Sequence, residues 1–177
     1  MKAIFLDRDG VINRTIYRDG VKASPRNISE LHIHDGVSEA IRLFKSAQYI
    51  PIVVSNQPDV ARNKMSISQL QEINYEISKR TGLEHFYMCA HDDIDNCDCR
   101  KPKTGLIKKA ISDYNITTEG SFMIGDQNRD IDAGLKESLS CIYISENKLK
   151  DIKYLKVLTA PSLIVASQLI LNGLHNE

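Results

Sequence analysis

Two aspartates, Asp7 and Asp9, directly follow the short apolar run Ala3–Leu6 and are the residues of this chain best suited to chemistry. The apolar run predicts a buried strand, and open α/β sheets bind their ligands at the carboxyl ends of strands. Carboxylates are costly to bury unless a cation or another partner compensates their charge. The pair therefore indicates a cation site, with Asp7 as a candidate nucleophile and Asp9 as a candidate proton carrier. The alternative is a solvated Asp-Gly turn at the strand end.

Three further groups of residues make the turn the weaker interpretation. Ser55 and Asn56 follow a second apolar run, Asp126 follows another, and Arg100 and Lys101 stand between them. A hydroxyl, an amide and two cations suit phosphate oxygens, and cations offset the repulsion between a carboxylate and a phosphate in the transition state. A Mg²⁺ ion prefers hard oxygen ligands, so two carboxylates, a backbone carbonyl and a phosphate oxygen would satisfy it.

Three cysteines and a histidine lie within eleven consecutive positions, as Cys89, His91, Cys97 and Cys99. Three thiolates and an imidazole form a closed tetrahedral set for a structural Zn²⁺ ion. A cytosolic setting favours metal over disulfides, and the alternative is a reduced loop without metal. Arg100 and Lys101 directly follow the last ligand, Cys99. A bound zinc ion would therefore hold these two cations in place beside a phosphate.

Strand-like and helix-like segments alternate along the chain, which predicts a parallel sheet with helices on both faces. The predicted strands are 3–6, 50–54, 86–89, 121–124 and 140–144. Helices are predicted after Asp35-Gly36, from a Ser66–Gln69 capping box to Gly82, after a Thr104 cap, over 131–136 and over 163–170. Parallel strands would bring the functional groups to one edge of the sheet. We therefore expect one Rossmann-like α/β domain over residues 1–177, with a small zinc-binding loop and no large cap domain.

Composition narrows the set of partners. The chain has 177 residues, and Lys plus Arg and Asp plus Glu both number 23, so no net field draws it to nucleic acid or to an acidic membrane surface. No apolar run reaches the length of a membrane span, and no signal peptide is visible. The basic stretch Lys148–Lys156 is interpreted as a solvated face. We expect a cytoplasmic monomer with no nucleic-acid or membrane partner.

Four motifs follow one another along the chain: Asp7-Arg8-Asp9-Gly10, Ser55-Asn56-Gln57, Arg100-Lys101-Pro102-Lys103 and Gly125-Asp126-Gln127-Asn128-Arg129-Asp130. Taken in this order, they resemble the haloacid dehalogenase superfamily of phosphatases. Within it, the chain resembles the branch containing histidinol-phosphate phosphatase and D-glycero-D-manno-heptose 1,7-bisphosphate phosphatase. The resemblance runs from Ile4 to about Ile144, which is most of the chain.

The resemblance implies catalytic roles for five matching residues. Asp7 would be the nucleophile that forms an aspartyl-phosphate. Asp9 would be the acid that protonates the leaving alcohol and then the base that activates water. Ser55 and Lys101 would hold the transferring phosphoryl group, with help from Asn56.

The resemblance also implies a metal site and substrate contacts. Mg²⁺ would be bound by the Asp7 side chain, the Asp9 carbonyl and Asp126. Arg100 and Gln127 would contact the rest of the substrate, a small phosphate ester.

Four other residues have less specific interpretations. Asp130 would orient its loop or cap the next helix. His32 and His34 lie in the polar segment 14–34, which reads as a loop or small flap, and either meet substrate or lie at the surface. Cys141 is expected to be a small core residue.

The substrate is constrained by the missing cap. Without a large insertion, the segment 14–34 and the zinc loop must shape the pocket, which favours a small soluble phosphoester. Val60-Ala61-Arg62 and the chain length resemble the heptose enzymes, whereas the five-residue gap before Cys97 resembles the histidinol-phosphate members. Gln127 stands where the heptose enzymes carry lysine. We expect removal of the 7-phosphate from a heptose bisphosphate. The alternatives are a histidinol-phosphate phosphatase, a mutase and a non-catalytic zinc-stabilised binding module.

Overall fold

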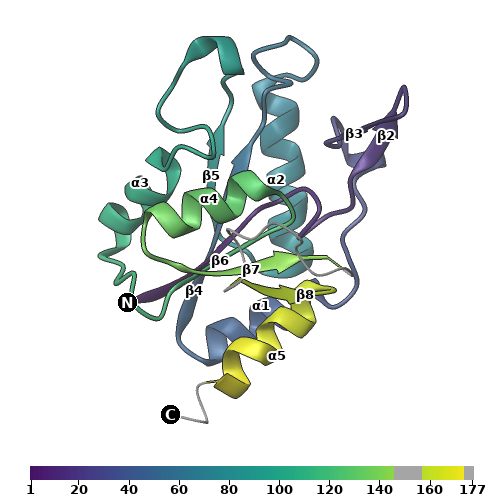
Figure 1. The fold of residues 1–177 in the computed structure, drawn as a ribbon. Helices are drawn as coiled ribbons and strands as arrows, with labels where there is room; N and C mark the ends of the chain where they lie inside the picture. Colours follow the sequence, from purple (N-terminus) through teal and green to yellow (C-terminus); the bar gives the residue numbers. More distant parts are fainter. Residues whose placement is uncertain (146–156, 174–177) are drawn as a thin grey trace.

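The computed structural model describes residues 1–145 and 157–173, built around one six-stranded sheet (Figure 1). Every neighbouring pair of strands is parallel, in the order β5-β4-β1-β6-β7-β8. Counted along the chain, this is the 3-2-1-4-5-6 order of a Rossmann-type sheet. The strands are β1 (Lys2–Leu6), β4 (Tyr49–Asn56), β5 (His85–Cys89), β6 (Phe122–Gly125), β7 (Ser140–Ile144) and β8 (Leu158–Ala160). The five predicted strands and the fold class are confirmed, and β8 is an additional strand.

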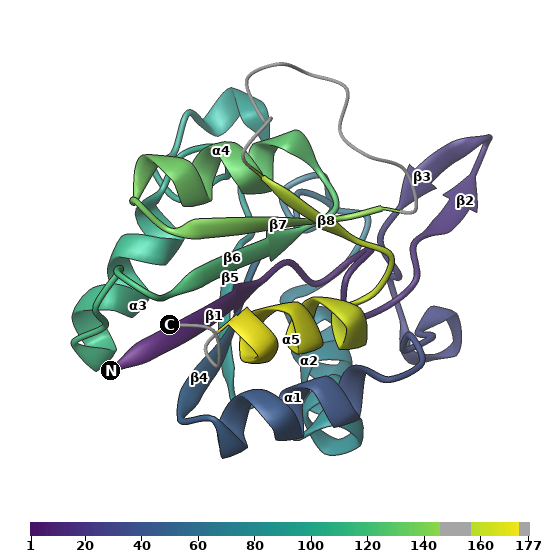
Figure 2. The same ribbon diagram turned by 60° about the horizontal axis from the view of Figure 1, so that its bottom comes forward.

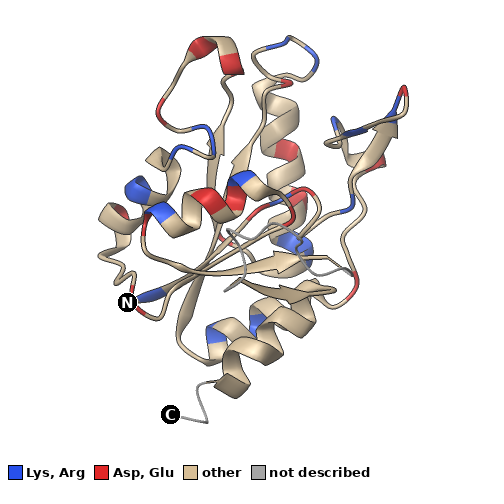
Figure 3. Cartoon of the chain, in the orientation of Figure 1, with Lys and Arg blue, Asp and Glu red and all other residues tan. Residues whose placement is uncertain are grey.

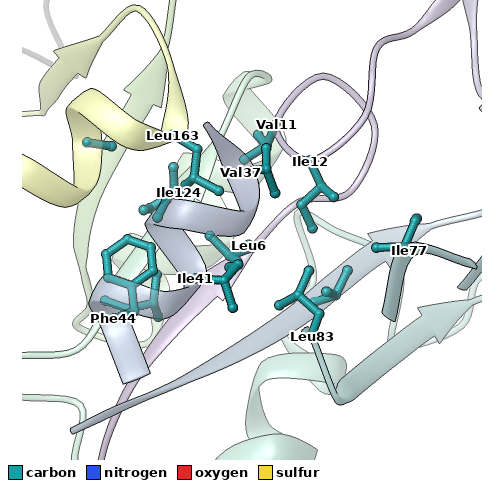
Figure 4. Close-up of a cluster of buried hydrophobic side chains, with 14 of the residues drawn as sticks. Leu6, Val11, Ile12, Val37, Ile41, Phe44, Ile77, Leu83, Ile124 and Leu163 are labelled. Carbon is teal, nitrogen blue, oxygen red and sulfur yellow. The ribbon is translucent and has the colours of Figure 1, made fainter. Parts of the chain in front are cut away.

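Helices cover both faces of the sheet, as Figure 2 shows. One face carries α1 (Val37–Ser46), α2 (Ile67–Thr81) and α5 (Leu163–Gly173), and the other carries α3 (Gly105–Tyr114) and α4 (Asn128–Lys136). Successive side chains of a strand point to opposite faces. Ile4 and Leu6 therefore join the core under α1, where Figure 4 shows Leu6 and Ile41, while Ala3 and Phe5 join the core under α3 and α4. Strand β1 is thus buried on both sides, which fixes the position of the residues that follow it.

Helix caps match the sequence in one case and differ in another. The Ser66 hydroxyl accepts from the Gln69 N–H at 3.1 Å and the Gln69 side chain accepts from the Ser66 N–H at 2.8 Å, so the predicted capping box is confirmed. The predicted Thr104 side-chain cap is wrong, because Thr104 precedes α3 without a capping hydrogen bond from its side chain. Its ψ of 5° departs from the extended backbone that aims a capping side chain at the helix.

The segment 14–34 contains a hairpin, β2 (Ile16–Arg18) with β3 (Val21–Ala23), and a short 3₁₀ turn, Ile28–Glu30. Asp19 and Gly20 join the two strands with positive φ angles of 51° and 76°, the two-residue turn that an Asp-Gly pair favours. The hairpin projects from the body of the molecule in Figures 1 and 2. It is therefore a flap in shape.

Within residues 1–145 and 157–173, no cap domain is inserted between the elements of the sheet. Over the same residues, the helices are too short or too polar to cross a membrane. The basic stretch Lys148–Lys156 lies outside the described residues.

Candidate active site

The predicted catalytic residues meet at the carboxyl ends of three neighbouring strands. Asp7 and Asp9 follow β1, Ser55 and Asn56 end β4, and Asp126 follows β6. The strand order reverses between β1 and β6, which is where open α/β sheets bind ligands. All five residues line one pocket of about 180 Å³, called the catalytic pocket below.

Lys101 lies at the centre of this site although it comes from the loop after the cysteines. Its ammonium lies 2.9 Å from Asp7 and 2.7 Å from Asp130, and it donates to the Val54 carbonyl at 2.6 Å. Burial alone would lower the pKa of Lys101, but the carboxylates of Asp130 and Asp7 outweigh burial and raise it. Lys101 therefore stays a cation beside the predicted nucleophile.

Asn56 holds Lys101 by its backbone. Its Oδ1 accepts from the Lys101 N–H at 2.9 Å, and its Nδ2 donates to the Lys101 carbonyl at 3.0 Å. The position of Asn56 in its motif predicts that its side chain helps to hold the phosphoryl group directly. In the structure both polar atoms of its side chain face the Lys101 backbone, so Asn56 supports a phosphate site by positioning Lys101.

Asp9 accepts hydrogen bonds from three side chains to which the sequence patterns assign no role. Its Oδ1 accepts from Asn13 at 2.9 Å and from Arg8 Nε at 3.2 Å, and its Oδ2 accepts from Gln57 at 2.7 Å and from Arg8 Nη2 at 3.2 Å. Burial would raise the pKa of Asp9, but the Arg8 charge and the Asn13 and Gln57 bonds outweigh burial and lower it. Arg8 and Gln57 stand inside the motifs, and that position was the signal that could have identified them.

Three carboxylates, those of Asp7, Asp126 and Asp130, place one oxygen each within 4.8 Å of one another. Burial and then the Asp7 charge raise the pKa of Asp126, and they raise the pKa of Asp130 to about 6. The Asp126 Oδ1 atom is buried without a hydrogen-bond partner among the described residues. A divalent cation would compensate this crowded charge and use that oxygen, so the site fits Mg²⁺. Gly10 has a φ of 99°, which favours glycine, and a Cβ there would clash with the Asp126 carboxylate.

Asp130 combines the two roles that the sequence left open. It accepts from the Gln127 N–H at 3.0 Å, which caps α4, and it pairs with Lys101 inside the site. The Gln127 side chain donates to Asp126 Oδ2 at 3.0 Å and lines the catalytic pocket. Gln127 therefore faces the position that a substrate would occupy.

The four predicted zinc ligands converge in the loop that follows β5. The sulfur of Cys89 lies 3.6 Å from that of Cys97 and 3.0 Å from that of Cys99, and the latter two are 3.4 Å apart. The Nδ1 atom of His91 lies 3.2 Å from the Cys99 sulfur and 3.7 Å from the Cys89 sulfur. Ligand atoms on a shared tetrahedral Zn²⁺ centre would be roughly 3.7 Å apart. All four cysteines of the chain are free thiols, so the set fits zinc.

The zinc loop carries Arg100 to the mouth of the site. Its guanidinium pairs with Asp93 of the same loop at 2.6 Å. A second pair, Asp92 with Arg62 at 2.6 Å, ties the zinc loop to the loop between β4 and α2. The two loops are therefore joined above the sheet, and both arginines face the pocket described next.

A larger pocket of about 600 Å³ adjoins the catalytic pocket and shares Lys22, Asn56 and Arg129 with it. The hairpin β2–β3, the loop after β4 and the zinc loop form its walls, and Figure 3 shows Lys and Arg on all three segments. Its lining includes two carboxylates, Asp19 and Asp59, and seven cations. The cations are Arg18, Lys22, Arg26, Arg62, Lys64, Arg100 and Arg129. This basic pocket suits an anionic group.

His32, His34 and Cys141 lie outside this centre. His34 lines a shallow depression beside the site together with Arg14, and burial followed by the Arg14 charge lowers the pKa of His34. His32 is exposed. Cys141 is buried in the core beneath α4, as expected.

Known proteins resemble this chain in sequence and in fold. A family model described as HAD-hydrolase-like matches residues 98–169. The D-glycero-beta-D-manno-heptose-1,7-bisphosphate 7-phosphatase of Helicobacter pylori is 32% identical over 156 residues, which cover 84% of this chain and 87% of that protein. The corresponding alpha-anomer enzyme of Campylobacter jejuni is 30% identical over 158 residues, which cover 85% and 86%.

The fold of a solved structure agrees with these relatives. The D,D-heptose 1,7-bisphosphate phosphatase from B. bronchiseptica, complexed with magnesium and phosphate, superposes with a TM-score of 0.83 at 22% identity, covering 98% of this chain and 99% of that one. At that identity the likeness establishes the fold alone. With the sequence relatives, it shows that the chain belongs to the haloacid dehalogenase-like phosphatases, in the branch of the heptose bisphosphate phosphatases, and is a phosphoric monoester hydrolase.

Proposed function

We propose that this chain is a Mg²⁺-dependent phosphatase that removes the 7-phosphate from D-glycero-D-manno-heptose 1,7-bisphosphate. The named relatives support the substrate, and the observation that carries the proposal is the pair of adjoining pockets. The catalytic pocket offers Asp7 and Lys101 to one phosphate. The basic pocket adds seven cations, of which Arg18, Arg26, Arg62 and Arg100 pair with carboxylates. Lys22, Lys64 and Arg129 are therefore the cations most open to a second phosphate, which a monophosphate substrate would lack.

The proposed chemistry has two steps. In the first, an Asp7 carboxylate oxygen attacks phosphorus, the bond from phosphorus to the sugar oxygen breaks, and Asp9 gives a proton to that oxygen. In the second, water attacks the phosphorus of the aspartyl-phosphate, Asp9 takes a proton from the water, the bond from phosphorus to the Asp7 oxygen breaks, and inorganic phosphate leaves with the Asp7 carboxylate restored. Ser55 and Lys101 hold the phosphoryl oxygens in both steps. Asp7, Asp126 and the Asp9 carbonyl would hold Mg²⁺, which would supply positive charge that offsets the repulsion between carboxylate and phosphate.

We further propose that Zn²⁺ is bound by Cys89, His91, Cys97 and Cys99 as a structural ion. Four protein ligands leave no open position for substrate. The ion would hold the zinc loop in shape, and with it Arg100 and the backbone that leads into Lys101.

Histidinol phosphate is the main alternative substrate, and the gap in the zinc loop favours it. It carries an ammonium group and only one phosphate, so it would bring no second anionic group to the cations of the basic pocket. A non-catalytic binding module would lack part of the reactive set, whereas Asp7, Asp9 and Asp126 line a single pocket. A monomeric state and a cytoplasmic location stay predictions.

The test is Mg²⁺-dependent phosphate release from both anomers of the heptose 1,7-bisphosphate, from heptose 7-phosphate and from histidinol phosphate. We expect kcat/KM for the bisphosphate to exceed that for the 7-phosphate by about tenfold or more, because the second phosphate gains charge-assisted hydrogen bonds. Preference for histidinol phosphate, or equal use of the 7-phosphate, would contradict the proposal. Isomerised substrate without phosphate release would indicate a mutase.

Substitution of one cation tests whether the basic pocket binds the second phosphate. Lys64 lines the basic pocket and not the catalytic pocket, so Lys64→Gln should raise the KM for the bisphosphate and leave the KM for p-nitrophenyl phosphate within about twofold. Arg42→Gln is the matched control, because Arg42 is an exposed residue of α1 that lines neither pocket. Equal effects of the two variants would remove the basic pocket from substrate binding.

A further inference from the structure

We infer that Gln57 is a positioning residue that couples Asp9 to Ser55, so that the proton carrier and the phosphate-holding hydroxyl are oriented by one side chain. The inference rests on the roles proposed above for Asp9 and Ser55. Gln57 itself touches neither the reacting phosphate nor the metal in that scheme, and the motif comparison assigns no chemistry to it.

The side-chain amide of Gln57 is fully engaged. Its Nε2 atom donates to Asp9 Oδ2 at 2.7 Å and to Ser55 Oγ at 3.0 Å, and its Oε1 atom accepts from Arg8 Nη2 at 2.9 Å. The residue is completely buried, and its backbone N–H donates to the Cys89 carbonyl at 2.7 Å. The amide is therefore held on both sides, by its own backbone and by three side chains.

The three partners require an amide at this position. Asp9 and Ser55 each take a donated hydrogen, and the Arg8 guanidinium needs an acceptor, because it carries donors only. Two donors and one acceptor on a single planar group are what glutamine supplies. The reversed amide orientation would set its oxygen against the Asp9 carboxylate and its NH₂ against a guanidinium, so the network also fixes which way the amide points.

The hydrogen bond to Ser55 has a consequence for phosphate binding. A hydroxyl has one hydrogen to donate, and the Ser55 oxygen accepts from Gln57. The Ser55 hydrogen is therefore available to a phosphoryl oxygen in the catalytic pocket, which Ser55 lines. Without Gln57, the Ser55 oxygen would lose the donor that orients it.

The hydrogen bond to Arg8 links Gln57 and Asp9 to helix α2. Arg8 is fully buried and donates hydrogen bonds to the Asp9 carboxylate through Nε and Nη2. Its Nη1 atom donates to Asn74 Oδ1 of α2 at 3.2 Å. Arg8 donates to both Asp9 oxygens, Asn13 donates to Oδ1, and Gln57 donates the shorter of the two hydrogen bonds to Oδ2, at 2.7 Å against 3.2 Å from Arg8 Nη2. Removal of Gln57 would therefore leave Oδ2 with the longer bond alone and loosen the orientation of the carboxylate.

The test uses the dependence of rate on the leaving group. An alkyl phosphate needs a proton on its leaving oxygen, whereas p-nitrophenolate leaves without one, so loss of acid catalysis selectively slows the alkyl substrate. We expect Gln57→Met to lower kcat/KM for the heptose bisphosphate about tenfold more than kcat/KM for p-nitrophenyl phosphate. Asp9→Asn should show the same selectivity, and Gln71→Met, at an exposed amide of α2, should change neither value.

A second variant guards against misfolding. Gln57→Glu keeps the side-chain length and the acceptor for Arg8, but replaces the donor that faces Asp9 with a like charge. It should show the same selective loss while retaining a cooperative thermal transition. Equal losses on the two substrates in a folded Gln57 variant, or no loss at all, would overturn the inference.

The outcome also separates this inference from the proposed substrate. Wild-type protein that hydrolyses other alkyl phosphates but not the heptose bisphosphate refutes the substrate, and the ratio is then measured with the best alkyl phosphate. Wild-type protein inactive on every phosphate ester overturns both.

Discussion

Replacing Asn56 by alanine removes both side-chain hydrogen bonds to the Lys101 backbone, at 2.9 and 3.0 Å. The N–H and C=O of Lys101 would lose their partners in a residue that is 2% exposed. A buried backbone group without a partner costs about 1–3 kcal/mol. Because Asn56 borders the catalytic pocket, water can reach the space it leaves, so we expect the lower part of that range for each group, about 2–4 kcal/mol in all.

This destabilisation corresponds to a fall in the thermal midpoint of about 4–16 °C for a chain of this size. Activity should fall as well, by about tenfold to hundredfold, because Lys101 would no longer be held beside Asp7. Thermal unfolding and phosphate release would be measured with Gln71→Ala as the control, since that amide is exposed on α2. Lost activity with an unchanged midpoint would refute the clamp and favour the direct phosphate contact that the sequence analysis expects.

Three further predictions concern the zinc loop, the flap and the core. Cys97→Ser should release zinc and raise the KM for substrate more than it lowers kcat, and a stoichiometric zinc content in the purified variant would remove Cys97 from the ligand set. Burial opposes ionisation of Glu30, but the Arg26 N–H and the Arg18 guanidinium outweigh it and lower the pKa of Glu30. The stability from these contacts is therefore present above pH 4.5 and lost as the pH falls through the lowered pKa. In Glu30→Gln, the thermal midpoint should vary less with pH over that range than it does in the wild type. A midpoint profile identical to wild type would contradict this. Ile41→Ala, in a side chain 1% exposed, should cost about 2–5 kcal/mol in denaturant unfolding, and a loss below about 1 kcal/mol would show that the core collapses around the site.

The sequence was most informative where the side-chain pattern and the backbone pattern coincide. The apolar run before Asp7 is buried on both faces of the sheet, so the strand and the position of the carboxylate follow from one pattern. The flap shows the opposite case. Its Asp19-Gly20 pair marks the turn of a hairpin, but each flanking strand is three residues long, which is too short to establish an alternating pattern.

The side-chain networks were harder to predict because partners distant in sequence decide them. Asn56 reads as a phosphate ligand from its place in the motif, and only the path of the zinc loop brings the Lys101 backbone to it. Arg8 and Gln57 stand in the motifs, but their roles depend on a shared contact with Asp9 across two strands. Thr104 matches the residue type of a helix cap, and local backbone geometry prevents the bond.

The most direct test of the account is the effect of Asp7→Asn on phosphate release from the heptose 1,7-bisphosphate with Mg²⁺ present. The substitution keeps the size of the side chain and removes the attacking oxygen charge. We predict that turnover is abolished and that no phosphate becomes covalently attached to the variant, while its thermal midpoint stays that of a folded protein. Activity within about tenfold of wild type would show that Asp7 is not the nucleophile and would contradict the mechanism.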